Sequence, residues 1–121
     1  EYNQAMEEVV QQRRATERQT RDNYRGVLAG ISKVEALRNA VLSNEKAVQA
    51  AEAGFEVGTR AIIDVLDAQR DLLEARRDYA RSRYDYLLDT LELKQAAGIL
   101  SATDLAQVNE LLVEYSKYVM P

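Results

Sequence analysis

Two aspartates, Asp64 and Asp67, are the residues of this 121-residue chain whose type and spacing could support chemistry. They stand three positions apart, so that in a helix both carboxylates lie on one face. Paired carboxylates can share acid and base roles when their surroundings differ. The sequence has no histidine and no cysteine, however, and no glycine-rich phosphate loop accompanies the pair. We therefore expect no enzyme, with no catalytic residue, no metal site and no bound cofactor.

A reversal of the chain is predicted just before this pair. Gly54 and Gly58 interrupt a long helical pattern, and Thr59 then offers a hydroxyl suited to the start of a new helix. We expect a hairpin tip at residues 57–60, with both aspartates just beyond it.

The composition favours long helices over a compact globular core. The sequence has one proline, one phenylalanine, no tryptophan and 30% charged residues. This composition supplies too few large apolar side chains for such a core. The net charge of −4 and the isoelectric point near 4.9 argue against a nucleic-acid partner. A locally basic group near the N-terminus is interpreted as a solvated helix face, and its members are Arg13, Arg14, Arg18, Arg21 and Arg25.

Apolar residues recur every seven positions on both sides of the predicted turn, which is the pattern of a coiled-coil seam. Before the turn they are Val27, Val34, Val41, Val48 and Phe55, beside a row of small residues, Ala29, Ala36, Ser43 and Ala50. After the turn they are Val65, Leu72, Tyr79, Tyr86 and Leu93, beside Leu66, Leu73, Ala80 and Leu87 and a small row of Ala61, Ala68, Ala75 and Ser82. This apolar surface is wider than a two-helix seam requires.

The predicted fold is all-α, a long antiparallel coiled-coil-like hairpin followed by a short C-terminal helix in one elongated domain. Gly98 should stop the return helix, and Ser101 with Asp104 should form a capping box that starts the short helix, which should end near Tyr115. The expected segments are a long helix at 1–56, the tip at 57–60, the return helix at 61–97, and the short helix with its tail at 98–121.

An acidic row follows the same seven-residue period on the return helix. Its members are Asp64, Asp71, Asp78, Asp85 and Glu92. We interpret most of this row as a solvated face, partly offset by arginines at helical spacing. The expected ion pairs are Asp67 with Arg70, Glu74 with Arg77, and Asp78 with Arg81.

No apolar run approaches the roughly 20 residues of a membrane-spanning helix, and the N-terminus lacks the layout of a signal peptide. We therefore expect the chain as given to be soluble, and it is also compatible with a piece of a larger exported or membrane-bound protein. The pattern alone is also compatible with a structural coiled-coil interaction module that has no transport role. Such a module leaves the tip unexplained, because a plain coiled coil needs only a tight polar turn.

The chain resembles the TolC family of outer-membrane efflux proteins, most clearly between Val27 and Asn109. Four blocks in the family's order carry the resemblance: Val57-Gly58-Thr59-Arg60, then Asp64-Val65-Leu66-Asp67-Ala68-Gln69, then Ala80-Arg81-Ser82-Arg83-Tyr84-Asp85-Tyr86-Leu87-Leu88, and finally Leu93-Lys94-Gln95-Ala96-Ala97-Gly98-Ile99-Leu100-Ser101.

In that family each chain has two similar halves, each with membrane strands and a long periplasmic hairpin, and three chains form a tapered tunnel of twelve helices. The present sequence resembles the hairpin of the second half and the short helix of the equatorial region. The resemblance therefore implies a periplasmic piece of a homotrimeric outer-membrane channel of a Gram-negative bacterium, acting in efflux or secretion.

The resemblance also implies roles for residues at the tip. Val57, Gly58, Thr59 and Arg60 match the element that docks the periplasmic adaptor of a tripartite pump, whose inner-membrane transporter is reached directly or through the adaptor. Asp64 and Asp67 match carboxylates that line the closed periplasmic mouth, where rings of like charges would repel one another and attract cations. Arg60 matches a basic residue of the links that hold the mouth shut. Phe55 stands where the family often has a tyrosine in these links, and its ring lacks the hydroxyl.

Overall fold

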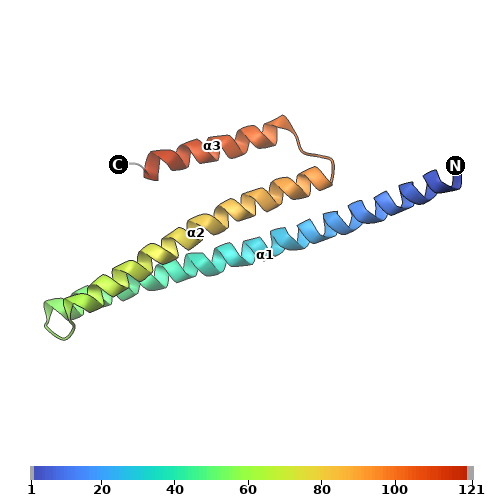
Figure 1. The fold of residues 1–121 in the computed structure, drawn as a ribbon. Coiled ribbons are helices and arrows are strands. Elements are labelled where there is room, and N and C mark those ends of the chain that lie inside the picture. The colour runs from blue at the N-terminus through green and yellow to red at the C-terminus, as the bar shows by residue number, and fades with distance from the viewer. Residues whose placement is uncertain (1, 120–121) are drawn as a thin grey trace. The chain divides into compact units, whose positions relative to one another are not determined.

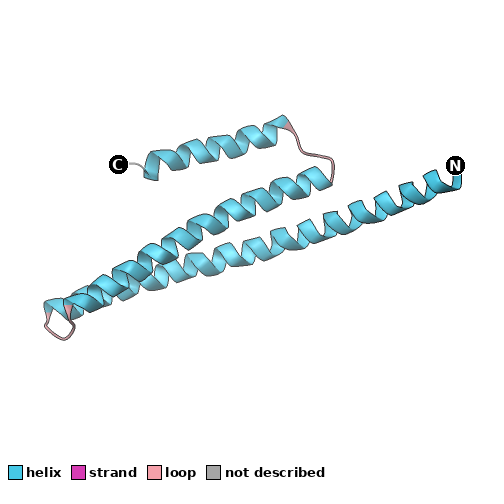
Figure 2. Cartoon of the chain, viewed as in Figure 1, coloured by secondary structure: helices cyan, strands magenta, loops and turns pink. Residues whose placement is uncertain are grey.

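The computed structural model describes the backbone of residues 2–119 as three helices (Figures 1 and 2). They are α1 (Tyr2–Glu56), α2 (Ile62–Ala96) and α3 (Ala102–Val119). Over these residues no strand occurs, so the prediction of an all-α hairpin followed by a further helix is confirmed. None of the described helices combines the length and the apolar composition that crossing a membrane requires.

The ends of α1 and α2 agree with the predicted ends to within one residue, but the end of α3 does not. The helix continues to Val119, four residues beyond the predicted end near Tyr115. That prediction was wrong because no glycine or proline stands between Tyr115 and Val119 to interrupt the helix.

The chain divides into two compact units, one formed by residues 28–86 and the other by residues 1–27 together with 87–121. Each unit is described by itself. The tip and both aspartates belong to the first unit.

In the unit of residues 28–86, α1 and α2 pack along a heptad seam that uses the predicted valine row of α1 together with a row that was not predicted, Leu37, Asn44 and Ala51. Val48, Ala51, Val65 and Ser82 are its buried members, and Ala51 has no exposed surface. The buried Ser82 hydroxyl donates a 2.8 Å hydrogen bond to the Tyr79 carbonyl, so no polar group is left unsatisfied there. Half-buried seam residues are Val34, Leu37, Val41 and Asn44 on α1, and Ala68, Leu72, Ala75 and Tyr79 on α2.

One predicted row of α1 and part of one predicted row of α2 lie outside this seam. Ala29, Ala36, Ser43 and Ala50 are exposed, as are Leu66 and Leu73. The hairpin partner therefore covers one face of each helix and leaves a second row of small or apolar residues in solvent.

Polar pairs on the edges of the seam set its register. Arg76 lies 2.9 Å from Glu45, and the Gln69 amide donates a 3.4 Å hydrogen bond to Glu52. The second pair is seven residues nearer the tip on both helices, as a regular antiparallel heptad packing requires. On the other edge, Lys33 lies 3.4 Å from Asp85.

Two of the three ion pairs expected within α2 are present, Asp67 with Arg70 and Glu74 with Arg77, each at 3.5 Å. The third expectation, Asp78 with Arg81, is wrong. Asp78 instead lies 3.0 Å from Arg77, and this hydrogen bond is the main cause of a raised pKa of the Arg77 guanidinium. Arg77 can bridge Glu74 and Asp78 at once, which Arg81 cannot. These groups are about half or more exposed, so solvent screening keeps the contribution of each pair to stability small.

In the other unit, the predicted capping box joins α2 to α3. The Asp104 carboxylate accepts a 3.0 Å hydrogen bond from the Ser101 N–H and a 2.8 Å bond from the Ser101 hydroxyl, and it forms an ion pair with Lys94. The hydrogen bond from Lys94, followed by those from Ser101, lowers the pKa of Asp104 from 3.8 to about 2. Gly98, with φ of 71°, ends α2, and the Ile99 N–H bonds the Lys94 carbonyl at 3.0 Å.

This depressed pKa predicts acid sensitivity of the α2–α3 connection. A carboxyl whose folded pKa lies below its unfolded value of about 3.9 stabilises the fold fully above that value and loses this contribution as the pH falls towards the folded pKa. Asp104→Asn should therefore be less stable than the parent chain at pH 7, and most of the difference should be lost at about pH 2, the folded pKa of Asp104. Denaturant unfolding followed by circular dichroism at both pH values measures this. Glu110→Gln, an exposed charge removal in α3, is the control, and an equal destabilisation by Asp104→Asn at both pH values would contradict the assignment.

Candidate functional site

The chain reverses between α1 and α2 through a glycine in the left-handed conformation. Gly58 has φ of 78°, its N–H bonds the Phe55 carbonyl at 3.0 Å, and the Thr59 N–H bonds the Gly54 carbonyl at 2.8 Å. This pair of bonds is a Schellman motif, which satisfies carbonyls that the end of a helix would otherwise leave unpaired. The predicted tip is thus confirmed, with a connection of residues 57–61 between the two helices.

Thr59 does not start α2, and that expectation is wrong. Its hydroxyl donates a 3.1 Å hydrogen bond to the Gly54 carbonyl, which belongs to the last turn of α1. The backbone carries Thr59 back over the end of α1 before α2 begins at Ile62. Three donors meet at the Gly54 oxygen, since the Arg60 N–H also reaches it at 3.1 Å.

The start of α2 is capped by Asp64 instead. Its carboxylate accepts a 3.0 Å hydrogen bond from the Ala61 N–H, and its own N–H bonds the Ala61 carbonyl at 3.1 Å. The spacing is that of Ser101 and Asp104, but Ala61 has no hydroxyl to complete the box. An acidic side chain in the first turn is also favoured by the helix dipole. The sequence signal that could have revealed this role is an aspartate at the third position of a helix, three residues after the cap.

Asp67 lies one turn further along α2 and is held differently. Its carboxylate lies 3.5 Å from Arg70, which also lies 3.7 Å from Asp71. Within the described residues no group of three or more histidine, cysteine, aspartate or glutamate side chains could hold a metal ion. The arrangement offers a short line of exposed carboxylates near the tip.

All the residues expected to act at the tip are exposed. Val57 retains 73% of its surface and Phe55 46%, while Gly58, Thr59 and Arg60 are also in solvent. The structure adds two apolar neighbours that the sequence reasoning missed, Ile62 and Ile63, and each is more than half exposed, as is Leu66 of a predicted apolar row. Their signal was an apolar pair directly after the turn, outside the heptad phase of Val65. Apolar residues gathered on one exposed end of a hairpin are typical of a contact surface.

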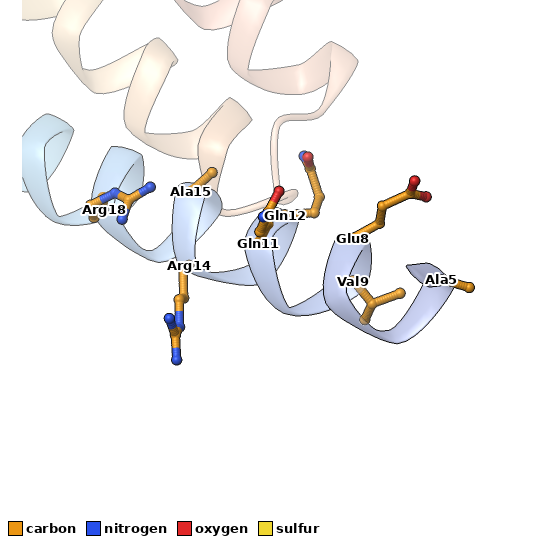
Figure 3. Close-up of a pocket in the computed structure, with 8 residues that line it drawn as sticks. All are labelled: Ala5, Glu8, Val9, Gln11, Gln12, Arg14, Ala15 and Arg18. Atoms are coloured by element: carbon orange, nitrogen blue, oxygen red, sulfur yellow. The ribbon is translucent and has the colours of Figure 1, made fainter. Parts of the chain in front are cut away.

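Figure 3 shows a second surface that could be considered, an open hollow along the N-terminal part of α1. Its walls come from a single helix, and Arg14 and Arg18 extend from it in different directions. The predicted solvated basic face is confirmed, since all five arginines there are exposed and Arg13 pairs with Glu17 at 3.1 Å. The hollow is lined by Ala5, Glu8, Val9, Gln11, Gln12, Arg14, Ala15 and Arg18. These side chains do not converge on a common point, so the tip remains the candidate functional site.

Comparison with known proteins identifies the family. The model of the family described as "Outer membrane efflux protein" matches residues 1–99. The chain belongs to this family. It is 42% identical over 81 residues to the outer membrane protein TolC of Vibrio cholerae serotype O1, which covers 67% of the chain and 18% of that protein. It is 38% identical over 108 residues to TolC of Escherichia coli strain K12, which covers 89% of the chain and 22% of that protein. The resemblance read from the four sequence blocks is therefore confirmed, and the chain spans about a fifth of the length of these relatives.

The incomplete cap of α2 gives a prediction about stability. Ala61→Ser should add the missing hydroxyl and stabilise the chain by about 1 kcal/mol, because serine is among the best N-cap residues and alanine among the poorest. Urea unfolding followed by circular dichroism measures the change. Ala47→Ser, at an exposed position within α1, is the matched control and should be slightly destabilising because serine has the lower helix propensity. Equal effects of the two substitutions would contradict the capping geometry.

Proposed function

We propose that this chain is a periplasmic segment of the tunnel of a trimeric outer-membrane efflux or secretion channel in a Gram-negative bacterium. The hairpin tip docks the adaptor of a tripartite pump, and the inner-membrane transporter is engaged directly or through that adaptor. Membership of the outer membrane efflux protein family supports the channel role. The single observation that supports docking is the tip itself, which presents Val57 to Arg60 in solvent on a hydrogen-bonded frame.

The frame suits docking because it needs little ordering when a partner arrives. Backbone hydrogen bonds from Gly58, Thr59 and Arg60 hold the turn, so binding a partner loses less conformational entropy than ordering a free loop would. A substituent on the Gly58 Cα would meet nothing within 4 Å, so an approaching partner has open access to the backbone there. Val57, Ile62 and Ile63 supply apolar surface around it.

We further propose that Asp64 and Asp67 form the periplasmic constriction when three copies surround one axis. Carboxylates brought together in this way repel one another and attract cations. The rings therefore oppose closure, and Arg60 contributes to the links that hold the mouth shut. Phe55 contributes only apolar contact, because it lacks the hydroxyl of a tyrosine. Adaptor binding that favours the open arrangement would then shift the channel towards it.

The second candidate, a structural coiled-coil module, accounts for the seam of residues 28–86 as well as the channel does. It does not account for the exposed apolar side chains at the tip, which a purely structural turn does not need. No enzymatic role is proposed.

Removal of charge at the constriction should reduce cation selectivity. Asp64→Asn with Asp67→Asn is preferred to alanine, because the amide oxygen can still accept the hydrogen bond from Ala61 that caps α2. In planar-bilayer recordings of the full-length channel, the double variant should lose most of its preference for cations over anions. Glu35→Gln, an exposed charge removal on α1, is the control. Selectivity equal to that of the parent channel would exclude both aspartates from the constriction.

A bulky residue at the tip glycine should block adaptor pairing. Gly58→Leu adds a side chain where a partner would approach and also forces leucine into a left-handed conformation. Gly98→Leu is the matched control, because Gly98 has φ of 71°, ends α2 in the same motif and also has open space around it. In the full-length channel, Gly58→Leu should abolish co-purification of the adaptor and drug resistance while the trimer persists, and Gly98→Leu should retain both. If Gly58→Leu kept normal resistance, the docking role would be wrong.

A further inference from the structure

Gly54 differs from the other tip glycine in what surrounds it. A Cβ atom built on Gly54 would lie 2.9 Å from Cγ and 3.0 Å from Cδ of Arg60, and 3.3 Å from the Thr59 hydroxyl. Carbon atoms in van der Waals contact are about 3.5 to 4.0 Å apart, so no side chain fits there while Arg60 keeps its place. The aliphatic stem of Arg60 thus occupies the position that a side chain on residue 54 would fill.

The need for glycine at this position is one of space. Gly54 lies inside α1 and does not have the positive φ of Gly58 and Gly98. Alanine would suit a helix better than glycine, since glycine carries a larger entropy loss on folding. Gly26, also inside α1, has nothing within 4 Å of a built Cβ. The crowding at Gly54 comes from Arg60 and Thr59, where the chain folds back over the end of the helix.

The backbone holds Arg60 against the same residue. The Arg60 N–H bonds the Gly54 carbonyl at 3.1 Å, and both the N–H and the hydroxyl of Thr59 bond that oxygen, at 2.8 and 3.1 Å. Gly54 thus holds Arg60 in two ways. Its carbonyl accepts a hydrogen bond from the Arg60 main chain, and its lack of a side chain leaves room for the Arg60 stem. In the part of the chain that the structure describes, no ion pair ties the Arg60 guanidinium, so the charged head remains available to a partner.

We propose that Gly54 is a positioning residue that seats the Arg60 stem on the end of α1 and so fixes where the exposed guanidinium lies. A long side chain loses rotamer entropy when a partner immobilises it, and a stem already packed on the backbone has lost part of that freedom beforehand. The use of the Arg60 guanidinium in docking or gate contacts rests on the proposed function. The seat itself rests only on the geometry of residues 54–60.

A double-mutant cycle on the 121-residue chain tests the seat. Gly54→Ala and the control Gly26→Ala are the same substitution in the same helix, and only the first should displace Arg60. Gly26→Ala should raise the midpoint of thermal unfolding, whereas Gly54→Ala should raise it less or lower it. In an Arg60→Ala background the crowding by the stem is gone and only the Thr59 hydroxyl at 3.3 Å remains, so Gly54→Ala should change the midpoint more favourably than it does beside Arg60. If Gly54→Ala had the same effect with and without the Arg60 side chain, the seat would be overturned.

Titration of the full-length channel with its purified adaptor tests whether the position of the Arg60 stem contributes to adaptor binding. Gly54→Ala should weaken binding by about three- to ten-fold, the cost of reordering one long side chain, and should cause no further loss once Arg60 is alanine. A loss of the same size in the Arg60→Ala background would show that Gly54 acts without Arg60 and would overturn the proposal. A further outcome is coupling between the two substitutions in thermal unfolding with adaptor binding that neither substitution changes. It would support the packing of Arg60 on Gly54 and would exclude Arg60 from docking. The two proposals therefore fail through different measurements.

Discussion

The reversal between α1 and α2 depends on one backbone oxygen, the Gly54 carbonyl, at which three hydrogen-bond donors meet. The end of a helix leaves carbonyls without partners, and here the chain supplies those partners by folding back over its own last turn. The direction in which α2 leaves the tip follows from that fold. The cross-helix pairs Gln69–Glu52 and Arg76–Glu45 then succeed each other at one heptad on both helices. The seam can keep its register because the turn length is held constant by hydrogen bonds.

Much of this fold could be predicted from periodicity. Val48 and Val65 stand at predicted seam positions and are buried, and the small residue Ser82 is buried at the position where the helices meet. Heptad spacing succeeds there because the side of a long helix that faces a partner repeats every seven residues, whatever the partner is. It does not say which of several apolar rows the hairpin itself covers, so the exposed row of Ala36 and Ala50 could not be assigned.

At the tip, residue type alone does not predict which helix end a polar side chain caps. Threonine is a favoured N-cap residue, yet the Thr59 hydroxyl serves the end of α1, while Ala61, with no side-chain acceptor, stands at the start of α2. Short polar side chains near a turn can satisfy either helix end, and only the path of the backbone decides between them. The same path brings the Arg60 stem over Gly54, a contact between residues six apart that no propensity describes.

The two aspartates are held in place by different means, and this difference bears on the proposed constriction. Asp64 is fixed by the start of α2, where a backbone N–H and the helix dipole both favour negative charge. Asp67 is held only by an exposed ion pair with Arg70, which contributes about 0 to 1 kcal/mol and leaves its side chain free to move. In the proposed trimer, repulsion between three copies of Asp64 would have to act against a rigid cap, whereas copies of Asp67 could turn towards their own arginines. In that proposed trimer a ring of Asp64 side chains would relieve its repulsion less easily within each chain than a ring of Asp67 side chains, and opening of the proposed mouth is the movement that would relieve it.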